Sequence, residues 1–411
     1  MAFDLSNASN ILKVHYLPPI REQLNNATIL LKRIQRDDAV PVGGKTFTVP
    51  LHTSRNITAG SGRADGGTLP TASQQGYSIA VVPNSYLYGR IQVTGPAVAA
   101  ARSDAYAFVR AVESEIKGCM KDFKKSMNRQ LLSDGRDALA FWTGADDTSG
   151  TNVDDSRGNA FVHLPAGQTV TCDLIDASDN STVLGNAIVV TLGAAAATNY
   201  AITWTGSVSG SADADYLVLD DTLGNQMMGI GGIIDDGNPP LLAGGLHGLA
   251  VASNTWWESQ VIDGDTPGTN QALTFPRLQL PLDRIAINSD FDENDVKFLL
   301  TSYGVRGKYV DICRDDRRHV NTMTLDGGFK AVDFNGIPIV PDPQAPKNTI
   351  FYVVPEVLRI MRSSDFDWMQ KDGAVLSRVS NQDAYEATLL HYGNLACTAR
   401  NALGRLNDVT E

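Results

Sequence analysis

Two patterns of hydrophobic and polar residues meet between residues 46 and 134. Apolar and polar residues alternate over Thr46–Leu51, and β-forming residues cluster over Tyr77–Val93, which predicts two strands. The residues between them, from Arg55 to Pro70, hold four glycines and no sustained apolar run. A β-ribbon whose tip has no core of its own is marginal in water. We therefore expect the ribbon to lie on another surface, provided by a neighbouring subunit.

From Ser103 onward the hydrophobic period changes from two to 3.6 residues, which predicts one amphipathic helix. Ser133-Asp134-Gly135 supplies its stop signal, so the helix should extend for about 45 Å at 1.5 Å per residue. An ordinary core helix of an α+β protein is the alternative interpretation of this segment alone. The expected apolar stripe comprises Ala105, Phe108, Val109, Val112, Ile116, Cys119, Met120, Phe123, Met127 and Leu131.

The remainder of the chain mixes short strand and helix patterns and predicts the α+β class. A helix is expected at Leu24–Gln35 and another from Phe291 to Tyr303. Between Gly158 and Thr222 short β-runs follow one another with almost no Lys or Arg, which predicts a small β-sandwich or barrel inserted in the fold. Its strands are expected at Ala160–Leu164, Thr169–Ile175, Ala187–Leu192, Tyr200–Thr205 and Tyr216–Leu219. Later strands are expected at Tyr309–Cys313, Gly328–Phe334, Ile337–Val340 and Thr349–Val354.

Several strings are similar to one phage protein family. They are Tyr16-Leu-Pro-Pro-Ile-Arg, Thr46-Phe-Thr-Val-Pro-Leu-His, Gly62-Arg-Ala-Asp-Gly-Gly-Thr-Leu-Pro, Tyr86-Leu-Tyr-Gly-Arg-Ile-Gln and Gly336-Ile-Pro-Ile-Val-Pro-Asp. Together with the order of arm, ribbon, long helix and mixed α+β remainder, they resemble the major capsid proteins of tailed bacteriophages, which have the HK97-like fold. The resemblance covers about residues 1–140 and 225–405 and is a pattern of order and spacing, not a chemical motif.

The resemblance implies a division of the chain into named parts. These are an N-terminal arm (1–45), an extended β-ribbon loop (46–95), a spine helix with the start of a peripheral domain (96–157), the inserted β domain (158–222), an axial domain with its connections (223–374) and a return to the peripheral domain (375–411). The arm is interpreted either as an ordinary N-terminal helix or as a segment that crosses to a neighbour. The inserted domain is expected to decorate and stabilise the outer surface.

The same resemblance implies self-assembly into hexamers and pentamers of an icosahedral shell around double-stranded DNA. Contacts between copies are expected from charged and apolar residues of the ribbon and near the capsomer axis: Arg55, Arg63, Asp65, Leu69, Tyr77, Arg314, Asp315, Asp316, Arg317 and Arg318. Some family members link a ribbon lysine covalently to an asparagine, but Thr46–Val93 contains no lysine. Noncovalent contacts should therefore hold the shell together.

Further partners follow from the resemblance. A portal and a decoration protein are among them. A separate scaffolding protein is also expected, because the ribbon begins too near the N-terminus to leave room for a scaffolding prodomain. The protein should assemble in the host cytoplasm and reside in the virion capsid. No membrane partner is expected, since neither a signal peptide nor an apolar run of membrane-spanning length is present.

Composition and spacing argue against catalysis and against nucleic-acid binding as the main task. The formal net charge of −12 provides no basic arm for phosphate neutralisation. The six histidines and four cysteines are scattered, and no metal-ligand or nucleophile motif occurs, so we expect no enzyme, cofactor or metal site. The run from Gly229 to Ile234 is interpreted as a loop bend, Trp256-Trp257 as core, and the acids Asp146, Asp147, Asp154 and Asp155 as a solvated linker.

Three functions thus remain from the sequence. The first is a phage major capsid protein, and the second is an encapsulin-like compartment shell of the same fold. The third is a β-rich carbohydrate-binding surface or tail protein, which the inserted domain suggests.

Overall fold

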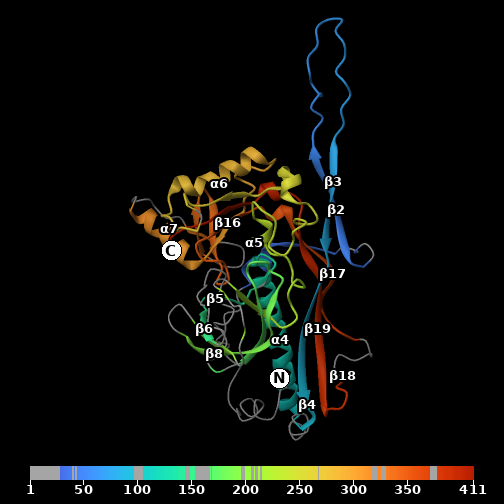
Figure 1. Ribbon diagram of the computed structural model, residues 1–411, viewed down its shortest axis with the longest axis vertical. Coiled ribbons are helices and arrows are strands. Elements are labelled where there is room, and N and C mark those ends of the chain that lie inside the picture. The colour runs from blue at the N-terminus through green and yellow to red at the C-terminus, as the bar shows by residue number, and fades with distance from the viewer. Residues whose placement is uncertain are drawn as a thin grey trace.

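The molecule is elongated, with a long β-ribbon projecting from an α+β body (Figure 1). The computed structural model describes residues 28–38, 41, 44–96, 105–136, 138–143, 149–152, 167, 169–195, 200–204, 208, 212, 215–266, 268–315, 322–324, 330–370 and 377–411. The acids Asp146, Asp147, Asp154 and Asp155 and most of the arm lie outside these residues. No helix in the described ranges is both long enough and apolar enough to cross a membrane.

The ribbon consists of β2 (Thr46–Ser54) and β3 (Gly76–Pro83), which pair antiparallel in a separate two-stranded sheet. The expected strand over Tyr77–Val93 is therefore two strands, because β4 (Ser85–Thr94) leaves the ribbon after Asn84. Proline at position 83 has no N–H for a ladder, and the N–H of Asn84 donates to the carbonyl of Lys45 instead.

Strand β4 enters a second sheet that forms the long axis of the body. It pairs along its full length with β19 (Ala384–Cys397), which also pairs with β17 (Leu358–Trp368). Strands β1 (Gln35–Asp38) and β18 (Ser377–Arg378) complete the five-stranded sheet. In the described part of the predicted N-terminal helix, α2 occupies Ile29–Arg33 and ends earlier than expected, because β1 starts at Gln35; residues 24–27 lie outside the described residues.

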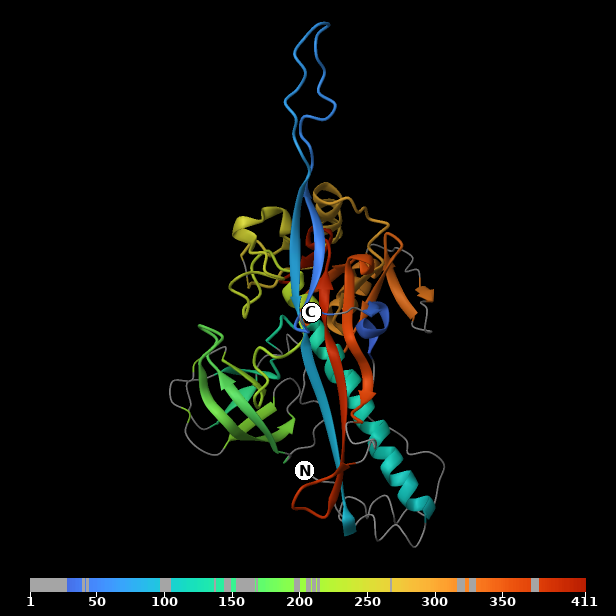
Figure 2. The same cartoon turned by 90° about the vertical axis from the view of Figure 1, so that its right-hand side faces the viewer.

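The predicted long helix is present as α4, the spine helix (Ala105–Leu132), which runs beside β4 and β19 (Figure 2). In its described apolar stripe Phe123, Met127 and Leu131 are buried, the last two at 1% and 0% exposure, whereas Ile116, Cys119 and Met120 are half-buried. At Gly89 of β4 an added Cβ would lie 2.9 Å from the Phe123 ring. Glycine at this position therefore lets the helix approach the sheet closely.

The spine ends where Ser133 and Gly135 break the helix, with Gly135 at φ +94°. The run that was expected to be a loop bend instead forms the short helix α5 (Ile230–Ile233). Its glycines face the last carbonyls of the spine: a Cβ on Gly231 would lie 2.9 Å from the Leu132 oxygen. The glycines thus serve a close contact between two helix ends, which a sequence pattern cannot distinguish from a bend.

A closed barrel follows the spine, in the order β10-β5-β6-β9-β8-β7. Its strands are β5 (Ala140–Thr143), β6 (Ser149–Asn152), β7 (Thr169–Ile175), β8 (Val183–Ala195), β9 (Tyr200–Trp204) and β10 (Tyr216–Leu219). The barrel thus begins near Ala140, whereas the sequence placed its start at residue 158 and interpreted the preceding residues as spine and linker. The expected strand at Ala160–Leu164 lies outside the described residues.

The C-terminal half forms a seven-stranded sheet in the order β11-β20-β16-β12-β15-β14-β13. Its strands are β11 (Gln260–Ile262), β20 (Gly404–Leu406), β16 (Ile350–Val353), β12 (Phe298–Thr301), β15 (Ile337–Pro341), β14 (Lys330–Phe334) and β13 (Thr322–Thr324). Helices α6 (Phe275–Asn288) and α7 (Tyr303–Asp315) pack against it. Short 3-10 turns occupy Val251–Ser253, Thr255–Trp257, Pro355–Val357 and Arg400–Ala402.

Two sequence predictions in this half are wrong. The helix expected from Phe291 to Tyr303 is a turn followed by the buried strand β12, and the strand expected at Tyr309–Cys313 lies inside helix α7. Both segments are short apolar runs, for which periodicity does not separate a buried strand from a buried helix. The core assignment of Trp257 is confirmed by its 1% exposure.

The contact between α5 and the spine generates a stability prediction. Gly231→Ala should lower the unfolding free energy by about 1–3 kcal/mol, because its Cβ meets backbone oxygens that cannot move away. Gly118→Ala, in the middle of the spine with no atom within 4 Å of the added Cβ, should raise it by about 0.5–1 kcal/mol. Urea unfolding of both variants measures the difference, and effects of the same sign would contradict the packing described.

Candidate assembly surface

The outward face of the ribbon is apolar and exposed. Along β2 and β3 the burial alternates, so Phe47, Val49, Leu51, Ala80 and Val82 face the body. On the other face Tyr77, Ile79 and Val81 are exposed at 73%, 62% and 39%. Their partners across the ladder are His52, Pro50 and Thr48. We call these six residues the ribbon strip.

The sequence analysis selected Tyr77 from this strip as an expected contact residue and did not single out Ile79 and Val81, which are exposed on the same face. The signal was available, because β3 carries large apolar residues at alternate positions in addition to the buried Ala80 and Val82. A strand that is apolar on both faces is typical of one that is covered on both sides.

The base of the ribbon is fixed to the body by buried polar contacts. The N–H of Val81 donates to the carbonyl of His247 over 2.8 Å, and Nε2 of His247 accepts from the N–H of Cys397 over 3.2 Å. Burial lowers the pKa of His247 to about 3, and Arg400 acts in the same direction. The ring is therefore neutral and keeps its acceptor nitrogen at ordinary pH.

A second anchor is Asn394 of β19, whose side chain is 2% exposed. Its Nδ2 donates to the Pro83 carbonyl and its Oδ1 accepts from the N–H of Met228, each over 2.8 Å. One side chain thus joins the end of the ribbon to the segment that returns from the barrel.

Beyond the Ser54–Gly76 pair the ribbon has no strand pairing: residues 55–75 form turns and irregular backbone. Leu69 is 83% exposed and Ile57 92% exposed. The expected contact residues Arg63 and Asp65 are also exposed. Arg55 instead forms an ion pair of 2.9 Å with Asp290 of its own chain, and both side chains remain open to solvent.

Helix α7, which ends with the expected axial charges Arg314 and Asp315, lies far from the ribbon tip (Figure 1). Arg314 is exposed and lies 3.9 Å from Asp311 one turn earlier on α7. Asp315 is the last residue of that helix. Asp316, Arg317 and Arg318 lie outside the described residues. Among the described residues, the structure therefore does not bring Arg314 close to the expected contact residues of the ribbon tip within one chain.

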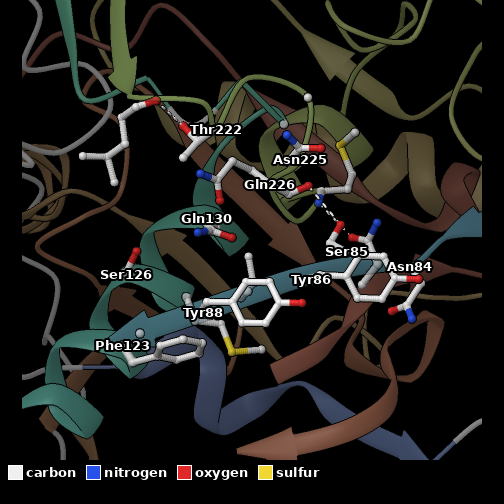
Figure 3. Close-up of a pocket in the computed structure, with 18 of the residues that line it drawn as sticks. Asn84, Ser85, Tyr86, Tyr88, Phe123, Ser126, Gln130, Thr222, Asn225 and Gln226 are labelled. Carbon is white, nitrogen blue, oxygen red and sulfur yellow. Dashed lines mark hydrogen bonds between the residues drawn. The ribbon is translucent and has the colours of Figure 1, made fainter. Parts of the chain in front are cut away.

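A cleft of about 1260 Å³ lies between β4, one face of the spine and the segment that leaves the barrel (Figure 3). The consecutive residues Tyr86–Ile91 all border it, so the cleft follows the edge of β4. Tyr86 and Tyr88 are exposed there, and Ser85 Oγ donates to the carbonyl of Gln226 across one end. Glu115 of the spine also borders it; burial raises its carboxyl pKa, and Asp122 adds to the shift.

One acidic cluster was tested as a metal site. Oxygens of Asp173, Asp220 and Asp221 lie within 4.8 Å of one another. The two oxygens of Asp173 accept hydrogen bonds from the backbone of Ala187 and Asp221. Since Asp220 and Asp221 are exposed, the cluster is explained as a set of turns that Asp173 stabilises.

Comparison with known proteins places this fold. No protein-family model matches the sequence, and no curated protein matches it significantly. Among solved structures, a chain of the cyanophage A-1(L) capsid asymmetric unit aligns with a TM-score of 0.59 and 15% identity, covering 98% of this chain and 99% of that one. The chain therefore shares the fold of a phage capsid protein, an α+β fold.

Two further structures align over nearly the full length at lower TM-scores. The holo-SrpI encapsulin complex from Synechococcus elongatus PCC 7942 gives 0.48 with 11% identity, covering 100% of this chain and 96% of that one. A chain titled Mycobacterium phage Bobi gives 0.45 with 11% identity, covering 99% of each chain. The fold assignment rests on the cyanophage capsid chain.

The anchors at the ribbon base predict a contrast in stability. Asn394→Ala should lower the unfolding free energy by about 2–4 kcal/mol, because it leaves a buried N–H and a buried carbonyl without partners. Arg55→Ala should lower it by less than about 1 kcal/mol, since its ion pair is exposed. Urea titration measures both, and a loss at Arg55 equal to that at Asn394 would refute the assignment of the anchors.

Proposed function

We propose that this protein is a phage major capsid subunit that assembles into hexamers and pentamers of an icosahedral head enclosing double-stranded DNA. The observation that carries the proposal is the ribbon strip, in which the large apolar side chains of Tyr77, Ile79 and Val81 are exposed on a projecting hairpin that is fixed at its base. Exposed apolar surface of this kind marks a protein–protein contact. The shared fold with a phage capsid chain supports the same conclusion.

The shape of the subunit favours rings of copies. The ribbon projects from the body (Figure 1), and the cleft beside β4 is a hollow surface that starts at the ribbon base, where Pro83 and His247 border it. A contact between two different surfaces of identical subunits is head-to-tail, and it closes into a ring when the rotation between copies permits. Hexamers and pentamers are rings of this type.

The barrel is proposed to be an inserted domain. Its first and last strands, β5 and β10, are adjacent, and the N–H of Leu139 donates to the Leu217 carbonyl over 2.8 Å. Entry and exit therefore lie side by side, as insertion into a surface loop requires. Arg136 fastens the barrel to the spine end: it pairs with Asp134 over 2.8 Å and lies 5.1 Å from the Tyr216 ring centre.

The insertion should thus span about residues 138–220, and the remaining parts of the proposed division keep their roles as arm, ribbon, spine, axial domain and peripheral return. The same proposal includes three further points. The barrel faces outward, and the partners are a portal, a scaffolding protein and a decoration protein. Contacts between copies involve Arg63, Asp65, Leu69 and the charges after Arg314.

Removal of the ribbon tip tests the assembly role. Deleting Asn56–Ser73 leaves Arg55-Gln74-Gln75 to connect the Ser54 and Gly76 pair, a loop length that hairpins accept. The variant should remain soluble and folded by circular dichroism but should form no closed shells in negative-stain electron microscopy, because it keeps the strip and lacks the tip that adjusts to the different neighbours of a closed shell.

Two point variants provide the matched comparison for this deletion. Ile79→Asp places a charge in the ribbon strip, and Val189→Asp places one at a valine exposed at 43% on the barrel. Only the first should abolish shells. Normal particles from the tip deletion and from Ile79→Asp would refute the role of the ribbon.

The enclosed material separates a phage head from an encapsulin-like compartment. A net charge of −12 disfavours tight binding of DNA by the shell wall. Weak binding suits a shell that must be filled with DNA and later release it. Particles from the native source should contain nuclease-protected double-stranded DNA, released only when the shell is disrupted. A protein cargo without DNA would support the compartment function instead.

A further inference from the structure

Strand β17 carries a bulge opposite His391 of β19. The register passes from Ser364, opposite Tyr392, to Asp367, opposite Leu390, so Asp365 and Phe366 have no ladder partners of their own. The Phe366 ring stacks on the imidazole with 5.0 Å between centroids and 27° between planes. Oδ1 of Asp365 lies 3.9 Å from Nδ1 of the same imidazole.

His391 is buried without a hydrogen bond. Its side chain is 1% exposed, and neither ring nitrogen has a hydrogen-bond partner within the part of the chain that the structure describes. A neutral imidazole has one N–H donor and one acceptor nitrogen, so both capacities are unmet. Such a group is costly and calls for a functional reason.

The charges around the ring are mostly positive. Arg362 and Asp365 face it from β17, and Arg36 faces it from β1. Lys124 of the spine lies 5.6 Å from the centre of the Phe366 ring. On β4, the residue opposite His391 is the apolar Leu87. Arg362 already pairs with both Asp38 and Asp365, so little negative charge is left to receive an imidazolium.

The cluster joins elements that are distant in sequence. Phe366 contacts Phe123 of the spine edge-to-face at 5.5 Å, and Arg36 of β1 lies 5.9 Å from the centre of the Phe366 ring. His391 therefore supports a ring that packs against the spine helix and lies close to Arg36 of the edge strand β1.

We propose that protonation of His391 in mildly acidic solution loosens the packing of the spine helix on the long sheet and gives the subunit a built-in acid trigger. The added charge has no room to be hydrated, meets Arg36 and Arg362, and disturbs the stacked Phe366. The inference concerns the single subunit and holds whether or not the subunit forms a shell.

The direction of the pH dependence follows from linkage. Burial lowers the pKa of His391 from 6.5 to about 4; Asp365 opposes this shift, and Arg36 and Arg362 reinforce it. The unfolded chain therefore binds a proton between these two values that the folded chain does not. The contribution of neutral His391 to the unfolding free energy is fully present above pH 6.5 and is lost as the pH decreases toward 4.

The first test compares thermal unfolding midpoints at pH 7 and pH 5 for the wild type, His391→Leu and His247→Leu. His247 is also buried with a lowered pKa, so each single variant should remove about half of the acid-induced fall. If His391→Leu shows the same fall as the wild type, the proposal is wrong.

The second test needs no variant and remains informative if His391→Leu does not fold. Hydrogen exchange by mass spectrometry, corrected for intrinsic rates, compares the wild type at the two pH values. Protection of Leu358–Trp368 and of the spine residues 115–132 should fall by about tenfold or more at pH 5, while barrel strand Thr169–Ile175 keeps its protection. Unchanged protection in the sheet and spine would overturn the proposal.

Discussion

The buried polar side chains near the end of the spine helix are the interaction on which the rest of the fold depends. Asn128 accepts from the N–H of Leu31 over 3.1 Å and donates to Asp342 over 3.2 Å. Gln130 accepts from the N–H of Met227 over 3.2 Å. A buried polar group without a partner costs about 1–3 kcal/mol. The spine therefore packs correctly only when the N-terminal helix, the C-terminal sheet and the segment after the barrel are all in place.

This arrangement explains how a whole barrel can sit between the spine and the rest of the body. The chain leaves the core after the spine and returns at Met227, where Gln130 and Asn394 hold it. The glycines that follow let α5 approach the spine end closely. Because entry and return are fixed within the core, the strands between them add a separate hydrophobic cluster, with Cys172, Leu174 and Val190 fully buried, and leave the main core unchanged.

Local patterns predicted those parts of the fold whose own periodicity is strong. The spine, the ribbon and most barrel strands follow from spacing, because one face of each is apolar over many residues. The strand at Phe298–Thr301 did not, since its four residues are buried on all sides and leave no alternation to detect. Asn128 and Gln130 gave no signal either, because polar residues on a helix ordinarily indicate its solvent face.

The exposed residues of the ribbon were predicted in the same partial way. Glycine content and the lack of a sustained apolar run marked the tip, and Tyr77 was selected as an expected contact residue. The exposure of Ile79 and Val81 depends on which face of the ribbon the body covers. Sequence alone does not give that face. Nor could it show that Arg55 pairs with Asp290, since 235 positions separate them.

The ribbon combines an ordered half and an unpaired half, and the difference matters for binding. His247 and Asn394 hold the strip in one geometry, so a partner that docks on it loses little additional conformational freedom of the chain. Residues 55–75 have no ladder and must lose more freedom on contact. Affinity should therefore come mainly from the strip, while the tip adjusts to different neighbours, as the proposed assembly into both six-fold and five-fold rings would require.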